Sequence, residues 1–204
     1  SVPQRDKWRR EKQRQIFDDH LELSLTDSAG RRSGLGRVTH LVWPEAAMPF
    51  LPLESPEALA EIGRMLDGRV QLVTGALRVD DTPGRSGSAI PEQATAQRKV
   101  YNSLLVLGPG GTLTALYDKI HLVPFGEYLP LQPLLEAIGL RQLTRMRGGF
   151  TPGRKPRPLL TVPGLPPLLG LVCYEAIFPA AIIEGGDRPG VIVNVTNDGW
   201  FGNT

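Results

Sequence analysis

The feature that most constrains this sequence is an apolar run that ends on a single cysteine. Leu168 to Val172 has the leucine and valine content of a buried strand, and Cys173, the only cysteine in 204 residues, follows directly. Residues 176–184 then read as a short helix. A cysteine at such a junction can receive backbone N–H groups and a positive helix end, which both favour the reactive thiolate. Cys173 is therefore a candidate nucleophile, and a small buried hydrophobic side chain is the alternative.

Length and composition suit a globular domain, with 204 residues of which 41% are hydrophobic and 22% charged. A net charge of +2 gives no reason to expect a nucleic-acid partner. His20, His40 and His121 have spacings unlike those of a zinc site, and no cofactor is predicted. One cysteine excludes an internal disulfide, and no apolar run reaches the roughly 20 residues that span a bilayer.

Apolar runs and helical spacing predict a mixed order of elements. Strands are expected at 38–45, 70–79, 100–107, 112–117, 168–173 and 191–195, and helices at 5–25, 56–67 and 176–184. The first helix would place apolar side chains on or near one face, namely Trp8, Ile16, Phe17, Leu21 and Leu23. Loops are expected at 26–37, 80–99 and through much of 131–167. Strands that are separated by helices indicate an α/β class, although the hairpin at 100–117 breaks strict alternation.

Three ionisable side chains share one local setting, the mouth of an apolar strand. They are Glu45, Lys119 and Cys173. A thiol nucleophile needs a base, and a carboxylate can serve if burial raises its pKa. The oxyanion that then forms needs donors, which a lysine and backbone N–H groups can supply. The three residues are thus sufficient for acyl transfer through a thioester, although Glu45 could be a strand-end residue and Lys119 a surface charge.

Three short motifs carry a family resemblance. Trp43-Pro-Glu45, Tyr117-Asp-Lys119 and Cys173-Tyr-Glu175, in this order, resemble the carbon–nitrogen hydrolase (nitrilase) superfamily. The block from Tyr117 to Pro130 is more specific, and with Asn194 to Gly202 it resembles the apolipoprotein N-acyltransferase branch. The resemblance implies a nitrilase-like four-layer α-β-β-α sandwich and a Glu–Lys–Cys triad that matches Glu45, Lys119 and Cys173.

The same resemblance implies where the domain would work. Residues 1–204 would form a partial carbon–nitrogen hydrolase domain, cut at both ends. The transmembrane helices of the parent protein would lie outside this sequence. They would carry the domain on the periplasmic side of the bacterial inner membrane.

The implied reaction has two steps and no cofactor. Cys173, deprotonated by Glu45, would attack an ester of a glycerophospholipid while Lys119 stabilises the oxyanion. The acyl chain would then pass from the thioester to the α-amine of a diacylglyceryl-cysteine at a lipoprotein N-terminus.

Four further residues match family positions that are tied to activity. Glu127 and Glu175 would assist the triad, and Trp8 and Tyr174 would place the substrate. Packing aromatics and an acid in a helix turn are the alternatives by residue type. The apolar segment 131–140 would suit acyl chains or the membrane surface as a lid, and could equally be core.

Two other functions stay open at this stage. A soluble amidase of the same superfamily could use the triad on a C–N bond, although it would have little use for an apolar lid. A non-catalytic lipid- or lipoprotein-binding module is the second alternative, against which the intact Glu45, Lys119 and Cys173 count.

Overall fold

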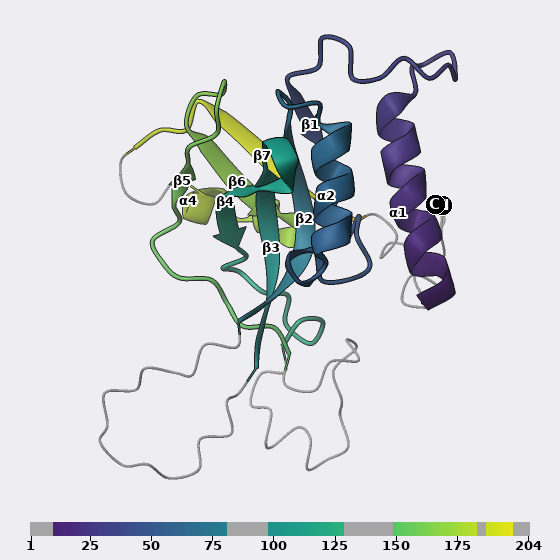
Figure 1. The fold of residues 1–204 in the computed structure, drawn as a ribbon. Helices are drawn as coiled ribbons and strands as arrows, with labels where there is room; N and C mark the ends of the chain where they lie inside the picture. The colour runs from purple at the N-terminus through teal and green to yellow at the C-terminus, as the bar shows by residue number, and fades with distance from the viewer. Residues whose placement is uncertain (1–9, 81–97, 129–148, 183–186, 198–204) are drawn as a thin grey trace, which may run out of the picture.

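The computed structural model describes most of the chain, over residues 10–80, 98–128, 149–182 and 187–197 (Figure 1). The α-helices are α1 (Arg10–Leu25), α2 (Pro56–Met65) and α4 (Pro179–Ile182), and three 3-10 turns lie at Pro52–Glu54, Pro109–Gly111 and Cys173–Ile177. The strands are β1 (His40–Val42), β2 (Gln71–Asp80), β3 (Lys99–Leu107), β4 (Leu113–Asp118), β5 (Leu159–Leu160), β6 (Leu168–Val172) and β7 (Val191–Val195).

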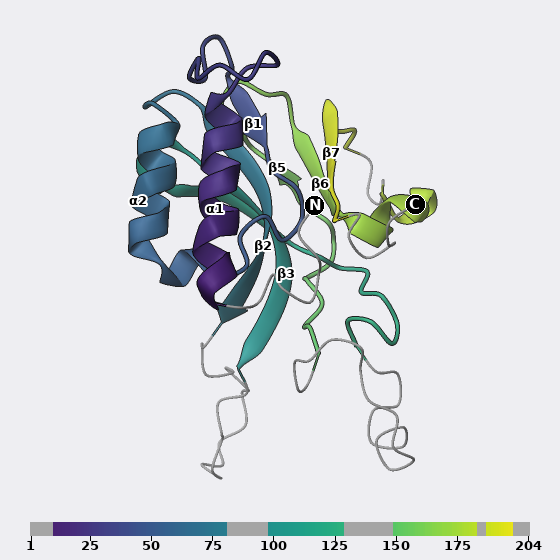
Figure 2. The same cartoon turned by 90° about the vertical axis from the view of Figure 1, so that its right-hand side faces the viewer.

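The strands form two sheets, in the orders β1-β2-β3-β4 and β5-β6-β7. Parallel pairs β1–β2 and β6–β7 combine with antiparallel neighbours, and β3–β4 is the predicted hairpin. Figure 2 shows the layers edge-on: α1 and α2 lie outside the first sheet, the second sheet packs on its other face, and α4 lies beyond that. The predicted α/β class and the α-β-β-α layering are confirmed.

Strand β3 explains why the first sheet is covered on both faces. Leu105 and Leu107 pack on the helix side with Phe17 and Ile62, whereas Leu104 and Val106 pack between the sheets. Successive side chains of a strand point to opposite faces, so an uninterrupted apolar run such as 104–107 requires apolar cover on both.

Helix α1 buries the face that its spacing predicts, with one exception. Ile16 and Phe17 are buried, and the ring of Phe17 meets that of Trp43 edge-on at 6.4 Å. Leu23, expected on or near this face, is instead 72% exposed. The reason is geometric, since residue 23 is two positions beyond Leu21 and a two-residue step turns about 200° around a helix.

The segment after β6 differs from the prediction of one short helix over 176–184. A 3-10 turn begins at Cys173 itself, and α4 starts afresh at Pro179, which occupies a first helical position. The backbone N–H of Phe178 donates to the Glu175 carbonyl and closes the first turn. Cys173 therefore belongs to a tight turn rather than to the approach of a regular helix.

Several predictions fall on residues outside the described ranges. They concern Trp8, the loop at 80–99 for most of its length and the apolar segment 131–140. Within the described ranges, no helix is long and apolar enough to cross a membrane.

Candidate active site

Cys173 lies directly after β6, in a backbone conformation that residues other than glycine rarely adopt. Its φ is +53°, and its side chain is only partly buried. A positive φ at a non-glycine residue costs of order 1–3 kcal/mol and persists only where the surroundings enforce it. The Asn194 side chain donates to the Cys173 carbonyl at 3.4 Å, which ties this turn to β7. The chain therefore turns at Cys173 itself, so the thiol does not belong to the regular strand.

The environment of Cys173 does not favour the thiolate, contrary to the sequence-based expectation. Burial raises the pKa of the thiol, and the charge of Glu45 raises it further. A hydrogen bond with the Thr196 side chain, the Lys119 charge and the Tyr174 N–H act the other way without reversing the shift. The turn is too short to supply a strong helix dipole. The thiol therefore needs a base.

Glu45 is placed to be that base. It follows β1, is 7% exposed, and its N–H donates to the Thr196 carbonyl at 3.2 Å. Its Oε1 accepts a 2.7 Å hydrogen bond from Asn102, while its buried Oε2 has no full hydrogen bond among the described residues. A weak interaction with the Cys173 thiol is one of the influences on its pKa. Burial is the largest, and the pKa of Glu45 is raised overall.

Gly75 in β2 makes room for Glu45. A Cβ at this position would lie 2.6 Å from the Glu45 Cα and 3.2 Å from the Val195 Cγ2. We expect Gly75→Ala to push Glu45 away from Cys173 and to destabilise the fold by about 1–3 kcal/mol. The measurements are thermal unfolding and the rate of Cys173 alkylation by iodoacetamide.

Gly170→Ala is the matched control for this prediction. It lies in the facing sheet, where a Cβ would approach the end of the flexible Leu104 side chain at 3.2 Å. We expect it to leave the alkylation rate closer to the wild-type value. Equal rates for Gly75→Ala and the wild type would show that the close approach of Gly75 does not position Glu45.

Lys119 is the second polar group of the site and lies at the end of β4. It is 1% exposed, and its backbone N–H donates to the Asn102 carbonyl at 2.8 Å. Its ammonium Nζ lies 2.8 Å from Oε2 of Glu127, which also accepts from the Val123 N–H at 2.8 Å. The charge of Lys119 acts on the pKa of both Glu45 and Cys173. Glu127 thus lies beside the lysine.

Asn102 is a site residue that the sequence analysis missed. Its side-chain amide donates to Glu45 at 2.7 Å and to Glu127 at 2.9 Å, so that it separates two buried carboxylates. Such a bridge fixes both carboxylates and reduces their repulsion. The sequence carried a signal, because Asn102 and Ser103 place polar side chains inside the run at 100–107 that predicts a buried strand. In the structure Asn102 is only 5% exposed.

The other predicted site residues, Glu175, Tyr174 and Trp8, differ in their exposure to solvent and in whether the structure describes them. Glu175 is fully buried and faces away from solvent among hydrogen-bond donors. Tyr174 is 38% exposed and packs edge-on against Phe178 at 5.2 Å, and the His121 ring lies 5.5 Å from that of Phe178. The exposed rings of Tyr174 and Phe178 belong to the segment that directly follows the nucleophile. Trp8 lies outside the described residues.

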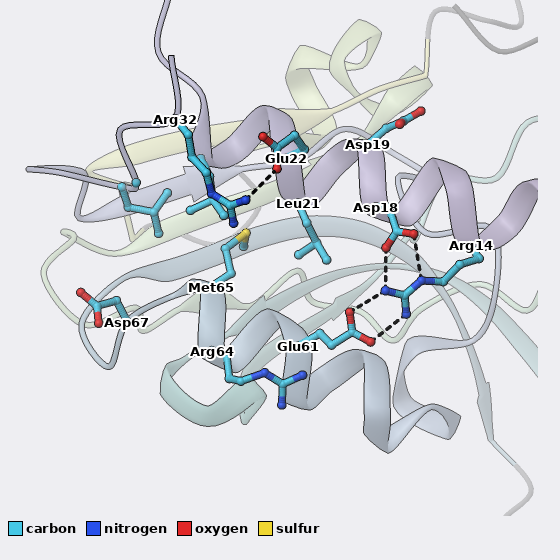
Figure 3. Close-up of a pocket in the computed structure, with 13 residues that line it drawn as sticks. Arg14, Asp18, Asp19, Leu21, Glu22, Arg32, Glu61, Arg64, Met65 and Asp67 are labelled. Carbon is cyan, nitrogen blue, oxygen red and sulfur yellow. Dashed lines mark hydrogen bonds and ion pairs between the residues drawn. The ribbon is translucent and has the colours of Figure 1, made fainter. Parts of the chain in front are cut away.

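A surface groove of about 680 Å³ lies elsewhere, between α1 and α2 (Figure 3). Several of its charged side chains pair with one another: Arg14 bonds both Asp18 and Glu61, and Arg32 lies 3.4 Å from Glu22. The groove is lined by residues of α1, of α2 and of the segments that follow these helices, and it includes none of the triad. Among the described residues, no group of three His, Cys, Asp or Glu side chains could hold a metal ion.

The geometry brings a thiol, a buried carboxyl with a raised pKa and a buried ammonium together at the ends of three strands. The carboxyl can take the proton of the thiol, and the ammonium can balance a developing oxyanion. This arrangement suits nucleophilic acyl transfer.

Comparison with known proteins agrees with this chemistry. Residues 13–204 match the family model of the carbon-nitrogen hydrolases. The chain is 44% identical over 188 residues to an apolipoprotein N-acyltransferase of Bradyrhizobium diazoefficiens, covering 92% of this chain and 33% of that protein. It is 41% identical over 202 residues to one of Rhodopseudomonas palustris, covering 99% of this chain and 36% of that protein. The chain thus spans about a third of the length of the curated relatives it matches.

Solved structures support the fold. A carbon-nitrogen hydrolase from Helicobacter pylori G27 aligns over 92% of this chain and 55% of its own, with a TM-score of 0.54 at 16% identity. A glutamine-dependent NAD+ synthetase from Acinetobacter baumannii aligns over 90% of this chain and 29% of its own, with a TM-score of 0.52 at 14% identity.

Proposed function

Because this chain belongs to the carbon–nitrogen hydrolase family, we propose that its activity is that of an apolipoprotein N-acyltransferase. The protein would transfer a fatty acyl chain from a glycerophospholipid to the N-terminal α-amine of diacylglyceryl-cysteine in lipoproteins. The observation that carries the proposal is the set of a partly buried Cys173 with buried Glu45 and Lys119, in a chain that is 44% identical to a protein of that name.

The first step forms a thioester. Glu45 accepts the proton of the Cys173 thiol, and the sulfur attacks the ester carbonyl carbon of the phospholipid. Lys119 stabilises the tetrahedral oxyanion. The carbonyl re-forms as the carbon–oxygen ester bond breaks, and Glu45 returns its proton to the departing lysophospholipid oxygen. The acyl chain remains on Cys173.

The second step discharges the thioester to an amine. The α-amine of diacylglyceryl-cysteine attacks the thioester carbonyl and loses a proton to Glu45. The carbon–sulfur bond breaks, the thiolate takes up the proton, and the product is an amide. A raised pKa suits Glu45 to both roles, because it must accept and release a proton in each step.

Other residues would position these groups. Glu127 would orient Lys119 through their 2.8 Å contact, and Glu175 would hold the turn around Cys173. Tyr174 and Trp8 would place the substrate. The exposed rings of Tyr174 and Phe178 would contact an apolar chain.

Under this proposal the domain would lie on the periplasmic side of the bacterial inner membrane. Transmembrane helices elsewhere in the protein would hold it there, next to both lipid substrates. Residues 1–204 would then be part of a carbon–nitrogen hydrolase domain within a larger chain.

The test is an acyl-transfer assay on the full-length protein in phospholipid. A synthetic peptide with an N-terminal diacylglyceryl-cysteine should gain the mass of one acyl chain as an amide. Ammonia release from small amides without peptide acylation would indicate an amidase instead. Binding of the peptide with neither reaction would indicate a binding module.

A further inference from the structure

Arg157 and Glu175 form a buried ion pair that the triad chemistry does not use directly. Their side chains are 3% and 0% exposed, and Nη2 of Arg157 lies 3.0 Å from Oε1 of Glu175. A buried carboxylate without a cation is strongly unfavourable. Arg157 is therefore the group that allows Glu175 to be ionised in the interior.

The Glu175 carboxylate joins the two sides of the active site. Its Oε1 accepts from the backbone N–H groups of Ile120 and His121 at 3.0 and 3.1 Å, directly after Lys119 in the chain. Its Oε2 accepts from the Val172 N–H at 3.0 Å, directly before Cys173. One side chain thus holds the segment that carries the ammonium against the turn that carries the thiol.

Arg157 is itself fixed by further partners. Its Nη1 donates to the Gly170 carbonyl in β6 at 3.0 Å and to the Tyr117 hydroxyl, and its guanidinium lies 4.8 Å from the centre of the Tyr117 ring. Tyr117 in turn donates to Oε1 of Glu175 at 2.7 Å. A planar guanidinium with several fixed donors holds a carboxylate in one orientation, which a lysine ammonium cannot do equally well.

From these contacts we infer that Arg157 is a positioning residue for Cys173 chemistry, acting through Glu175 to hold Lys119 next to the thiol. Arg157 touches no reacting atom. It keeps Glu175 charged and oriented, and Glu175 keeps the two backbone segments together. The inference rests on Cys173 as the nucleophile, as the proposed function does, but it needs no particular acyl donor.

The electrostatics of Glu175 agree with this arrangement. Burial acts to raise its pKa, but hydrogen bonds from Arg157, Tyr117 and the His121 N–H outweigh burial and hold the pKa below its ordinary value. Without Arg157, burial would prevail and Glu175 would take up a proton as the pH falls. A protonated carboxyl accepts backbone N–H groups less well, so the Lys119 segment would be released from the thiol.

The test measures alkylation of Cys173 by iodoacetamide against pH in the full-length protein, with Cys173→Ala as the background. Arg157→Met should lower the rate at neutral pH about tenfold and move the profile up by about one pH unit, because the thiol loses the nearby Lys119 charge. Arg157→Lys should lie between this variant and the wild type. Arg64→Met, at an exposed arginine of α2, is the matched control and should leave the profile unchanged.

A double variant tests the route through Glu175. Glu175→Gln added to Arg157→Met should cause no further shift, because the carboxylate no longer acts once its cation is lost. Additive shifts, or an Arg157→Met profile that superimposes on the wild type, would overturn the inference. If Arg157→Met does not fold, an Arg157→Lys profile identical to the wild type would overturn it. Alkylation uses no lipid substrate. The outcome of this test therefore does not depend on whether the acyl-transfer assay succeeds.

Discussion

Replacement of Glu45 by glutamine is expected to lower the rate of Cys173 acylation by about 10³-fold. Glutamine keeps the size of the side chain and can still meet Asn102, but it cannot accept the thiol proton. The loss should be severe because the pKa of the thiol is raised by burial, which leaves little thiolate at neutral pH. The measurement is single-turnover acylation followed by intact mass.

The same substitution should change how the rate of Cys173 acylation depends on pH. Glu45 acts as a base only when ionised, and its pKa is raised by burial. The wild-type rate should therefore level off above that raised pKa and fall below it. The Glu45→Gln rate should follow the ionisation of the thiol alone, without a break at the pKa of Glu45. Its defect should shrink at alkaline pH, where the thiol ionises unaided. Glu57→Gln, at an exposed position of α2, should behave as the wild type. A Glu45→Gln variant whose pH profile keeps the wild-type break would exclude Glu45 as the base.

Replacement of Lys119 by methionine is expected to lower acylation by about 10²–10³-fold, as loss of an oxyanion donor does. It should also lower stability by about 3 kcal/mol, because Glu127 keeps a buried charge without its 2.8 Å partner. Chemical denaturation and single-turnover acylation measure the two effects separately.

A second variant separates charge balance from catalysis. Lys119→Met with Glu127→Gln removes both charges of the pair, so most of the lost stability should return while the rate stays low. Lys12→Met, at an exposed position of α1, is the control for loss of a lysine. If the double variant regains the rate together with the stability, Lys119 has a structural role only.

The strands could be predicted because their signals are local. The apolar run before Cys173 and the runs at 70–79 and 100–107 each specify a buried strand by composition alone, and all three form as expected. Glu45, Lys119 and Cys173 share a strand-end setting in the sequence, but their grouping as a triad followed from the resemblance. The layering of two sheets followed from the resemblance rather than from the residues.

Long-range contacts could not be predicted because nothing local encodes them. Asn102 meets two carboxylates from distant segments, and Arg157 reaches Glu175 across the second sheet. The direction of the Cys173 pKa shift could not be predicted for the same reason. A strand end suggests helix-dipole activation, whereas burial and the charge of Glu45 decide the direction. Burial depends on the whole fold.

Intact-mass spectrometry of the full-length protein after incubation with phospholipid alone tests the central claim most directly. The account predicts a gain of one acyl chain that hydroxylamine removes, that is absent in Cys173→Ala, and that a diacylglyceryl-cysteine peptide discharges. An adduct that persists in Cys173→Ala, or peptide acylation in that variant, would contradict a thioester on Cys173.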